Sequence, residues 1–333
     1  MIKSKLNIFI KAVLLFAVCT TTLCACSVEN LLDYYLSENN VGSVYADNIS
    51  AHFIDVGQGD SIFIELPNHE CMLIDAGIAN KGEYIENYII STGYDTIDYL
   101  IATHPHADHV GSMDYIVSNM DIGSIYMPKV STTTKTYERL LEAVQEKGMK
   151  IKSARAGMSI VDEEDLNVDI LAPVEIDEGE LNNCSIIIKI TYESDSYLFI
   201  GDAEKEELST VTADMSADVL KVGHHGSRTS TTEEFLEEVN PEYAVISCGV
   251  DNDYGHPHEE AVNRWKKAGA KILRTDINGD ITFTTDGIDI DVNCSESNEF
   301  AYAKTGFIDM LLSFCKNIAK LIFSTEIPQT TRA

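Results

Sequence analysis

Apolar residues along the chain fall into short runs and into spacings of three and four, and the two patterns alternate. Short runs bounded by turn residues predict strands at 52–56, 61–66, 71–74, 99–102, 186–192, 197–200, 219–222, 243–247, 271–274, 281–284 and 288–292. Helical spacing predicts helices at 82–92 and 259–268, with others around 140–144 and 235–236. Asp286-Gly287, between two period-two segments, predicts a hairpin turn. The alternation favours an α/β domain.

The N-terminal segment has the pattern of an export signal. Three lysines within the first eleven residues precede an apolar run at 12–18 and a stretch of small residues. Leu23-Cys24-Ala25-Cys26 resembles a bacterial lipobox, in which the last cysteine carries lipid. We therefore expect a signal peptide at 1–25 and a lipid anchor on Cys26 that holds the protein on the extracellular face of the membrane. An uncleaved anchor or an ordinary secretory signal is the alternative.

The pattern also divides the rest of the chain. Residues 26–48 are polar and predict a tether, and residues 49–293 hold the strands and helices of one domain. Within a tail at 294–333, apolar residues at spacings of three and four predict an amphipathic helix over about 306–323. That helix either packs on its own domain or lies on a membrane surface or a partner.

Composition excludes two classes of protein. With 44% hydrophobic residues the chain can build a core, so wholesale disorder is excluded. The chain has 24 Lys and Arg against 54 Asp and Glu, a net charge of −30, which excludes a broadly basic nucleic-acid-binding surface. A polyanionic substrate would need local attraction, most simply from bound cations. Cys71 and Cys248 lie in apolar runs and are expected to be buried free thiols.

Candidate chemistry begins with the segment Thr103-His104-Pro105-His106-Ala107-Asp108-His109. Three imidazoles and a carboxylate within six positions, directly after an apolar strand, are typical ligands of zinc and similar divalent ions. The alternate residues His104 and His106 can face one metal, and the turn brings Asp108 and His109 towards a second. Asp202, in Gly201-Asp202 at the end of a predicted strand, can bridge two cations.

Two further histidine segments follow. The pair His224-His225 lies between glycines at a strand end, which suggests a metal or phosphate site. The segment 254–258 carries His256 and His258, either as part of that site or as a solvated loop. Lys221 and Arg228 are the cations nearest to these segments, and Arg228 can either hold a phosphate with two hydrogen bonds or form a surface salt bridge.

HFIDVGQGDS, LIDAG, THPHADHVG, the Gly-Asp pair, LKVGHHGS and GHPH occur in the order seen in metallo-β-lactamase-fold hydrolases. More narrowly, the chain resembles the extracellular β-lactamase-like domain of ComEC-type DNA-uptake competence proteins over about residues 51–292. The resemblance implies an αββα sandwich of two mixed β-sheets flanked by helices, with the metal site at one edge between the sheets. It also implies two divalent metal ions, zinc or manganese.

The resemblance assigns residues to the metal site. The implied ligands are His104, His106, Asp108, His109, Asp202 and one of the pair His224-His225, with His225 favoured. Asp75 in LIDAG is expected to brace the metal loop through hydrogen bonds, and Asp60 in DVGQGDS to support it from beneath. One departure stands out: no histidine occurs between His109 and His224, and Asn182 lies in the matching stretch. The first metal site would then bind loosely, prefer manganese, or fill only with substrate.

The expected reaction is hydrolysis by a hydroxide shared between two cations. Asp108 and Asp202 would hold and orient it, and His224 or His256 would protonate the leaving group or clamp a phosphoryl oxygen. Substrate contacts are expected from Asn182, Ser227 and Arg228. By resemblance the substrate is a phosphodiester, such as DNA. The alternatives are a phosphorylcholine ester, a lactone, a β-lactam, or a non-catalytic metal-binding lipoprotein, and the sequence identifies no protein partner.

Overall fold

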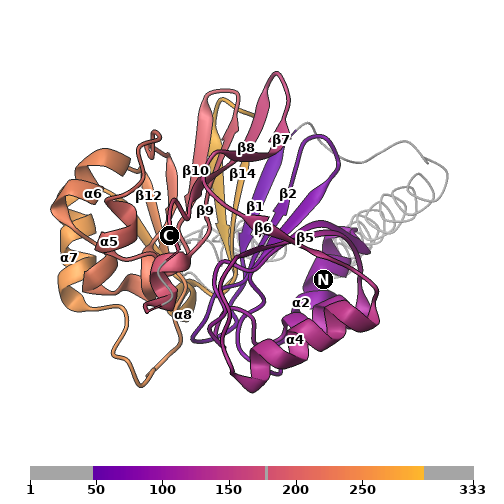
Figure 1. Ribbon diagram of the computed structural model, residues 1–333. Coiled ribbons are helices and arrows are strands. Elements are labelled where there is room, and N and C mark those ends of the chain that lie inside the picture. Colours follow the sequence, from indigo (N-terminus) through magenta and orange to yellow (C-terminus); the bar gives the residue numbers. More distant parts are fainter. Residues whose placement is uncertain (1–47, 177–178, 296–333) are drawn as a thin grey trace, which may run out of the picture. The chain divides into compact units, whose positions relative to one another are not determined.

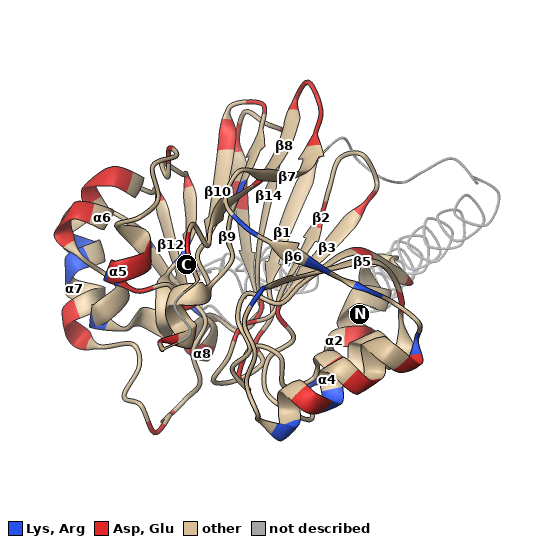
Figure 2. Cartoon of the chain, in the orientation of Figure 1, with Lys and Arg blue, Asp and Glu red and all other residues tan. Residues whose placement is uncertain are grey.

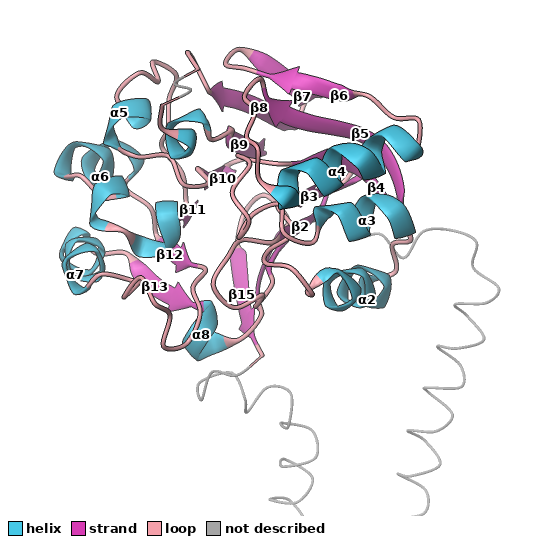
Figure 3. Ribbon diagram, turned by 60° about the horizontal axis from the view of Figure 1, so that its bottom comes forward, coloured by secondary structure: helices cyan, strands magenta, loops and turns pink. Residues whose placement is uncertain are grey.

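The computed structural model describes residues 48–176 and 179–295, which form two β-sheets packed face to face with helices on the outer faces (Figure 1). One sheet has the strand order β15-β14-β1-β2-β3-β4-β5-β6, and the other β13-β12-β11-β10-β9-β8-β7. Helices α2, α3 and α4 cover the first sheet, and α5, α6 and α7 cover the second (Figure 3). The predicted αββα sandwich of two mixed sheets is confirmed.

The first sheet is built mainly from the N-terminal half. Its strands are β1 (Ile49–Phe53), β2 (Ile62–Glu65), β3 (Cys71–Ile74), β4 (Thr96–Ile101), β5 (Asp121–Pro128), β6 (Ile151–Ala154), β14 (Ile281–Thr285) and β15 (Ile290–Cys294). Its helices are α2 (Gly82–Thr92), α3 (Met113–Asn119) and α4 (Lys135–Glu146). The chain returns to this sheet at its end, where β14 pairs antiparallel with β1. Strands β3, β4, β5 and β6 are parallel, so their carboxyl ends meet at one edge.

The second sheet follows in the C-terminal half. Its strands are β7 (Met158–Asp162), β8 (Leu166–Ala172), β9 (Ile187–Tyr192), β10 (Asp195–Phe199), β11 (Val219–Lys221), β12 (Tyr243–Ile246) and β13 (Lys271–Arg274). Its helices are α5 (Lys205–Leu208), α6 (Glu233–Val239), α7 (Glu259–Ala268) and α8 (Thr275–Asn278), with 3₁₀ turns η1 (Leu181–Cys184), η2 (Gly223–Gly226) and η3 (Arg228–Ser230). Strands β10 to β13 are parallel.

The main core lies between the two sheets. Phe53 of β1 packs against Phe199 of the opposite sheet and Phe283 of β14, with ring centroids 6.0 and 5.8 Å apart. All three side chains are buried. Burying a side chain of this size contributes about 1.5–3 kcal/mol. Because β1, β10 and β14 carry such residues on their inner faces, these contacts help to fix how the two sheets pack against each other.

Local pattern predicted most elements outside one region. The helices at 82–92 and 259–268, the strands at 71–74 and 271–274, and the hairpin at Asp286-Gly287 are confirmed. Between 113 and 172, however, the prediction missed every element except the helix near 140. Two of the missed strands, β6 and β7, lie at the edges of their sheets and are partly exposed. Partly exposed edge strands keep few of the apolar residues from which a strand is recognised.

The cysteine prediction is confirmed where the structure describes it. Cys71 and Cys248 are buried and not in disulfides. Burial raises the pKa of both thiols to about 12, so neither is a reactive thiolate at neutral pH. The signal peptide, the lipid site at Cys26, the tether and the helix at 306–323 lie outside the described residues. Among the described helices, none has the length and apolarity that a membrane crossing requires.

Helix α5 carries a buried acid that makes stability depend on pH. Glu207 is 4% exposed, and both of its carboxyl oxygens are buried. Burial raises its pKa from 4.5 to about 9, so the folded chain keeps a proton that the unfolded chain loses above pH 4.5. The stability from this proton is complete below pH 4.5 and is lost as the pH rises towards 9.

Replacing this acid should therefore flatten the pH profile of stability. In the wild type, Glu207 should lower the free energy of unfolding by about 1.4 kcal/mol per pH unit between roughly pH 5 and 9. In Glu207→Gln we expect this contribution to be absent. Urea unfolding of the metal-free protein and the variant, at pH 5, 7 and 9, measures both slopes. Equal slopes for the two proteins would contradict this account of Glu207.

Candidate metal centre

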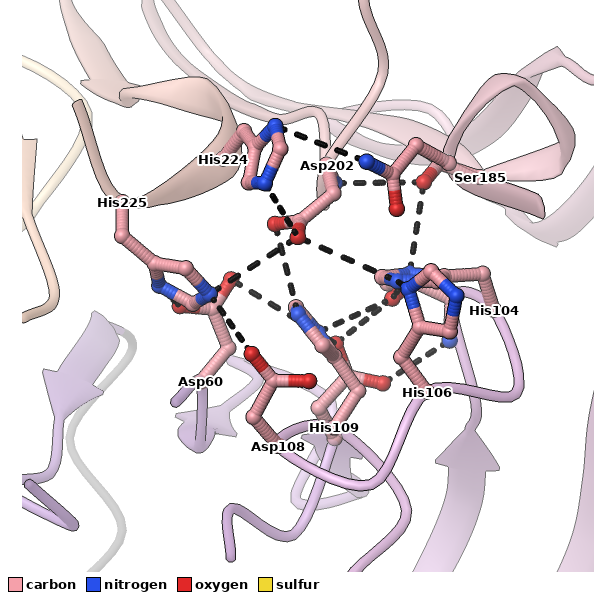
Figure 4. Close-up of polar contacts among 12 residues, drawn as sticks. Asp60, His104, His106, Asp108, His109, Ser185, Asp202, His224 and His225 are labelled. Atoms are coloured by element: carbon pink, nitrogen blue, oxygen red, sulfur yellow. Dashed lines mark hydrogen bonds and ion pairs between the residues drawn. The ribbon is translucent and has the colours of Figure 1, made fainter. Parts of the chain in front are cut away.

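Three of the histidine and aspartate segments converge where parallel strands end (Figure 4). The loop that holds residues 104–109 follows β4, Asp202 follows β10, and the pair His224-His225 follows β11. His225 Nε2 lies 3.2 Å from Asp108 Oδ2, although the two residues are 117 positions apart. The site therefore forms only when the two sheets pack together.

Asp202 is the centre of this cluster and is 2% exposed. Its Oδ1 lies 3.3 Å from His109 Nε2. Its Oδ2 lies 3.7 Å from His225 Nε2, 3.8 Å from His224 Nε2 and 3.9 Å from His104 Nε2. One buried carboxylate thus faces four imidazoles from two sheets, which is the position that the sequence expects of a bridging ligand.

Two sets of ligand atoms surround this carboxylate. In one, Asp108, His109, Asp202 and His225 each offer an atom, and these atoms all lie within 4.8 Å of one another. His109 Nε2 and Asp202 Oδ1 are buried and lie 3.3 Å apart without a well-aligned hydrogen bond, as expected of atoms that bind a cation. The other set is only a pair, His104 Nε2 and His106 Nδ1, which lie 3.0 Å apart. Imidazole and carboxylate are suitable ligands for divalent metals, so the residues fit the metal that the sequence predicts.

The far sides of three of these rings, those of His104, His109 and His225, are held by hydrogen bonds. His109 Nδ1 lies 2.7 Å from Asp75 Oδ2, and His225 Nδ1 lies 3.0 Å from the Ser247 carbonyl oxygen. His104 Nδ1 lies 3.2 Å from Thr103 Oγ1, and that hydroxyl donates to Asp75 at 2.6 Å. Since Asp75 accepts these bonds, it braces two rings of the cluster and leaves their Nε2 atoms facing Asp202.

Residues 54–250 match the family model described as the metallo-beta-lactamase superfamily. The chain belongs to this superfamily. Curated relatives are ComEC-type competence proteins: ComE operon protein 3 of Bacillus subtilis (strain 168) is 32% identical over 278 residues, covering 78% of this chain and 35% of that protein. Competence protein ComA of Neisseria gonorrhoeae is 29% identical over 233 residues, covering 69% of this chain and 31% of that protein. The chain thus spans about a third of the length of these relatives.

Among solved structures, the diiron β-hydroxylase CmlA from Streptomyces venezuelae is 15% identical. The match covers 71% of this chain and 54% of CmlA, with a TM-score of 0.46, a likeness that carries no argument about function. Superfamily membership and the His/Asp cluster together indicate a metal-dependent hydrolase.

A buried ion pair in this chain contacts the cluster through His225. Lys221 Nζ lies 2.7 Å from Asp60 Oδ2, and Asp60 Oδ1 lies 3.3 Å from His225 Nδ1. The side chains of Lys221 and Asp60 are 0% and 1% exposed. Lys221, one of the two cations nearest to the histidine segments in sequence, is therefore buried and not available to a substrate.

The glycine before Asp60 explains part of the DVGQGDS segment. A Cβ at Gly59 would lie 2.4 Å from the Asp108 carbonyl oxygen, and Gly59 has φ +157°. Asp60 N donates to the same oxygen at 3.1 Å. The turn thus packs directly against the metal loop, and only glycine permits that approach.

Electrostatics in the cluster favour bound positive charge. Burial acts to raise the pKa of Asp202, but His109 and His225 hold it well below its ordinary value. Burial acts to lower the pKa of His225, but Asp202 and Asp60 raise it to about 10, and Asp202 and Asp75 raise the pKa of His109 in the same way. In the metal-free protein, protons on these rings balance the buried acids, and a divalent cation would supply the same charge.

The loop after β12 forms one wall of the site. His256 is 9% exposed, and its ring centroid lies 5.2 Å from that of His224. Burial and His224 lower the pKa of His256 to about 4, so the ring is neutral and is better suited to clamp an oxygen than to act as an acid. Tyr254, which is 67% exposed, stacks on His256 with centroids 5.8 Å apart.

The predicted substrate residues lie in different surroundings. Asn182 is buried in η1, with Nδ2 3.5 Å from His224 Nδ1. Ser227 is buried and its hydroxyl accepts from Thr229 N, so this group caps η3. Arg228 is exposed and lines a surface depression that also contains Glu204.

Sequence reasoning missed several residues that orient the cluster. Glu204 Oε1 lies 2.9 Å from His224 Nδ1, and a signal for it was present as a second acid two positions after Asp202. Ser247 acts through its carbonyl oxygen and Thr103 through its hydroxyl. A backbone acceptor carries no side-chain signal, so Ser247 was not predictable from its residue type.

Proposed function

We propose that this chain is a metal-dependent phosphodiesterase that acts on single-stranded DNA or a chemically similar phosphodiester. One observation carries the proposal: Asp202 presents Oδ1 to His109 and Oδ2 to His104, so its two oxygens face different sets of ligands. Such a carboxylate suits a pair of cations, zinc or manganese. Bound there, divalent cations would polarise a phosphoryl oxygen and lower the pKa of water.

The chain's own residues supply the positioning. Asp108 and Asp202 hold the charge at the centre of the site, and Asp75 keeps His109 turned towards it. Neutral His256 can donate an N–H to a phosphoryl oxygen from the adjacent wall. Arg228, at the rim, can hold a second phosphate of an extended substrate.

Two features support a nucleotide substrate. Exposed Tyr254, stacked on His256 beside the cluster, offers a flat aromatic face for a base. The relatives named competence proteins also favour DNA. Against strong binding, acidic residues predominate over the chain (Figure 2), and the net charge is −30. Binding should therefore depend on the metal centre rather than on a basic groove.

We further propose that lipid on Cys26 holds this domain on the extracellular face of the cell membrane. The lysine-rich start, the apolar run and the Leu-Cys-Ala-Cys sequence support this location. A membrane-anchored enzyme would meet DNA, or wall and lipid phosphodiesters, outside the cell.

The test uses residues 27–333, which lack the predicted signal peptide and the lipid site at Cys26. This protein is loaded with manganese or zinc. Single-stranded DNA and bis-p-nitrophenyl phosphate should be hydrolysed, and His106→Ala should slow both by roughly a hundredfold or more, because it removes a cluster nitrogen. A phosphocholine ester, a lactone and a β-lactam are the comparison substrates. If the metal-loaded protein cleaves one of these and neither phosphodiester, the proposal is wrong. If none of the substrates turns over, a non-catalytic lipoprotein is favoured.

A further inference from the structure

We infer that Asn252 is a positioning residue for substrate, because it holds the loop of residues 249–258 in the shape that presents Tyr254 to a nucleobase. This loop joins β12 to α7 and carries the buried His256 and the exposed Tyr254. The inference rests on the proposed function and deepens it, since it assigns the part of the protein that recognises the base rather than the phosphate.

The side chain of Asn252 closes the loop on itself through four hydrogen bonds. Its Nδ2 donates to the carbonyl oxygens of Gly249, at 2.9 Å, and of His256. Its Oδ1 accepts from the backbone N–H groups of Tyr254, at 3.2 Å, and His256, at 3.0 Å. An asparagine amide offers two donors and one acceptor oxygen, and all of these groups are used here. One side chain therefore fixes the backbone on both sides of Tyr254.

Both ends of the loop are attached to turns that adjoin the metal cluster. Gly249 N donates to Gln58 Oε1 at 3.1 Å, and a Cβ at Gly249 would lie 2.7 Å from Gln58 N. At the other end, His258 N donates to the carbonyl oxygen of Gly226 at 3.0 Å. Gln58 lies in the turn between β1 and β2, and Gly226 ends η2 after β11. The loop is thus tied to one turn from each sheet, which also gives Gln58 of the DVGQGDS segment a role.

Tyr254 is the exposed aromatic group that this arrangement holds beside the site. Its ring stacks on His256 with an interplanar angle of 23°, and its high exposure leaves the opposite face open to solvent. His256 in turn lies against His224, whose Nε2 is 3.8 Å from Asp202 Oδ2, so a row of rings leads from the cluster to Tyr254. In a nucleotide one sugar separates the base from its phosphate. A phosphate at the cluster therefore leaves the base on the side of Tyr254, and every base can stack on an aromatic face.

The hydrogen bonds of Asn252 matter because a loop that is ordered before binding does not lose conformational entropy when the substrate arrives. Asn252→Ala removes all four hydrogen bonds and leaves the ring of Tyr254 in the chain. This variant should lose recognition of the base although the aromatic group is present. Such a result separates a residue that positions Tyr254 from one that contacts the substrate itself.

Two single-stranded oligonucleotides test the inference with residues 27–333 loaded with manganese. One strand carries adenine bases, and the other has the same sugar–phosphate chain without bases, so the strands differ in stacking and not in charge. In the wild type the KM for the abasic strand should be roughly tenfold higher. Tyr254→Ala and Asn252→Ala should both reduce this ratio to about twofold or less, and Tyr254→Phe should keep it. Asn252→Asp retains the acceptor oxygen but not the donors, so its ratio should be intermediate.

Asn68→Ala is the matched control. Asn68 also ties a turn through its side chain, because it donates to Glu70 and Glu163 and accepts from Glu70 N between β2 and β3. This variant should keep the wild-type ratio. Bound metal should be unchanged in Asn252→Ala, because the hydrogen bonds of Asn252 go to backbone groups of its own loop and not to the ligand rings.

Three results would overturn the inference: a wild type without the preference, a Tyr254→Ala that keeps it, or an Asn252→Ala that keeps it. Losses that add in the double variant would also overturn it, because a residue that acts through Tyr254 has no further effect once the ring is gone. Circular dichroism checks the fold, and if Asn252→Ala does not fold, Asn252→Asp decides.

Failure of the proposed function is distinguished by a second readout. If neither strand is cleaved, fluorescence anisotropy of the labelled strands gives the same ratio from their dissociation constants. A wild type whose preference for the adenine strand depends on Asn252, but which cleaves neither strand, would contradict the proposed function and not this inference.

Discussion

Asp202→Asn is expected to reduce phosphodiester hydrolysis by about a thousandfold or more and to lower bound metal below one equivalent per chain. The carboxylate lies within 3.9 Å of nitrogens from four histidines, so it is shared by both sets of ligands. The amide has nearly the same shape, but it lacks the negative charge and one of the two oxygens. The loss should therefore exceed that from removing a ligand of one set alone.

Activity on bis-p-nitrophenyl phosphate and metal content after dialysis measure this effect. Asp195→Asn is a matched control, because Asp195 is also buried and lies in β10, the strand that delivers Asp202. Its carboxylate accepts a hydrogen bond from Thr285 and lies outside the cluster. The control should retain metal and activity. If Asp202→Asn keeps more than about a tenth of the wild-type rate, Asp202 is not the shared ligand.

Lys221→Met is expected to lower the free energy of unfolding by about 3–5 kcal/mol. The lysine ammonium and the Asp60 carboxylate are both almost fully buried and lie 2.7 Å apart. Burial acts to raise the pKa of Asp60, but Lys221 and His225 hold it below its ordinary value. Removing the ammonium leaves a buried charge with less compensation, which costs more than the net contribution of the intact pair.

A double-mutant cycle separates this cause from simple loss of packing. Asp60→Asn combined with Lys221→Met removes both charges, so its loss of stability should be clearly smaller than the sum of the two single losses. Urea unfolding of the metal-free proteins measures each value. Additive losses would show that the ion pair has no special role. Because Asp60 also contacts His225, both single variants should bind metal more weakly than wild type.

Predictions from the sequence agree best with the structure where the residues that determine an element lie close together in the chain. The helix at 259–268 was predicted to the residue, because its apolar face and its acidic first turn lie within ten residues. The segment 103–109 predicted a metal-binding loop for the same reason, since three histidines and an aspartate occur within six successive positions after a strand. The order in which this segment and the other motifs occur along the chain was enough to indicate the superfamily and the αββα fold.

Other properties depend on contacts between distant segments. From the sequence, Lys221 is a cation close to the histidine segments, but in the fold it is buried against Asp60 from the other sheet. The sequence suggests one ligand from the pair His224-His225, yet both Nε2 atoms lie within 3.8 Å of Asp202 Oδ2, and both residues have left-handed backbone angles. The sequence alone determined which residue types carry the chemistry and in what order. Which of them meet, and with what orienting partner, was decided only by the packing of two sheets and by backbone angles that no local spacing encodes.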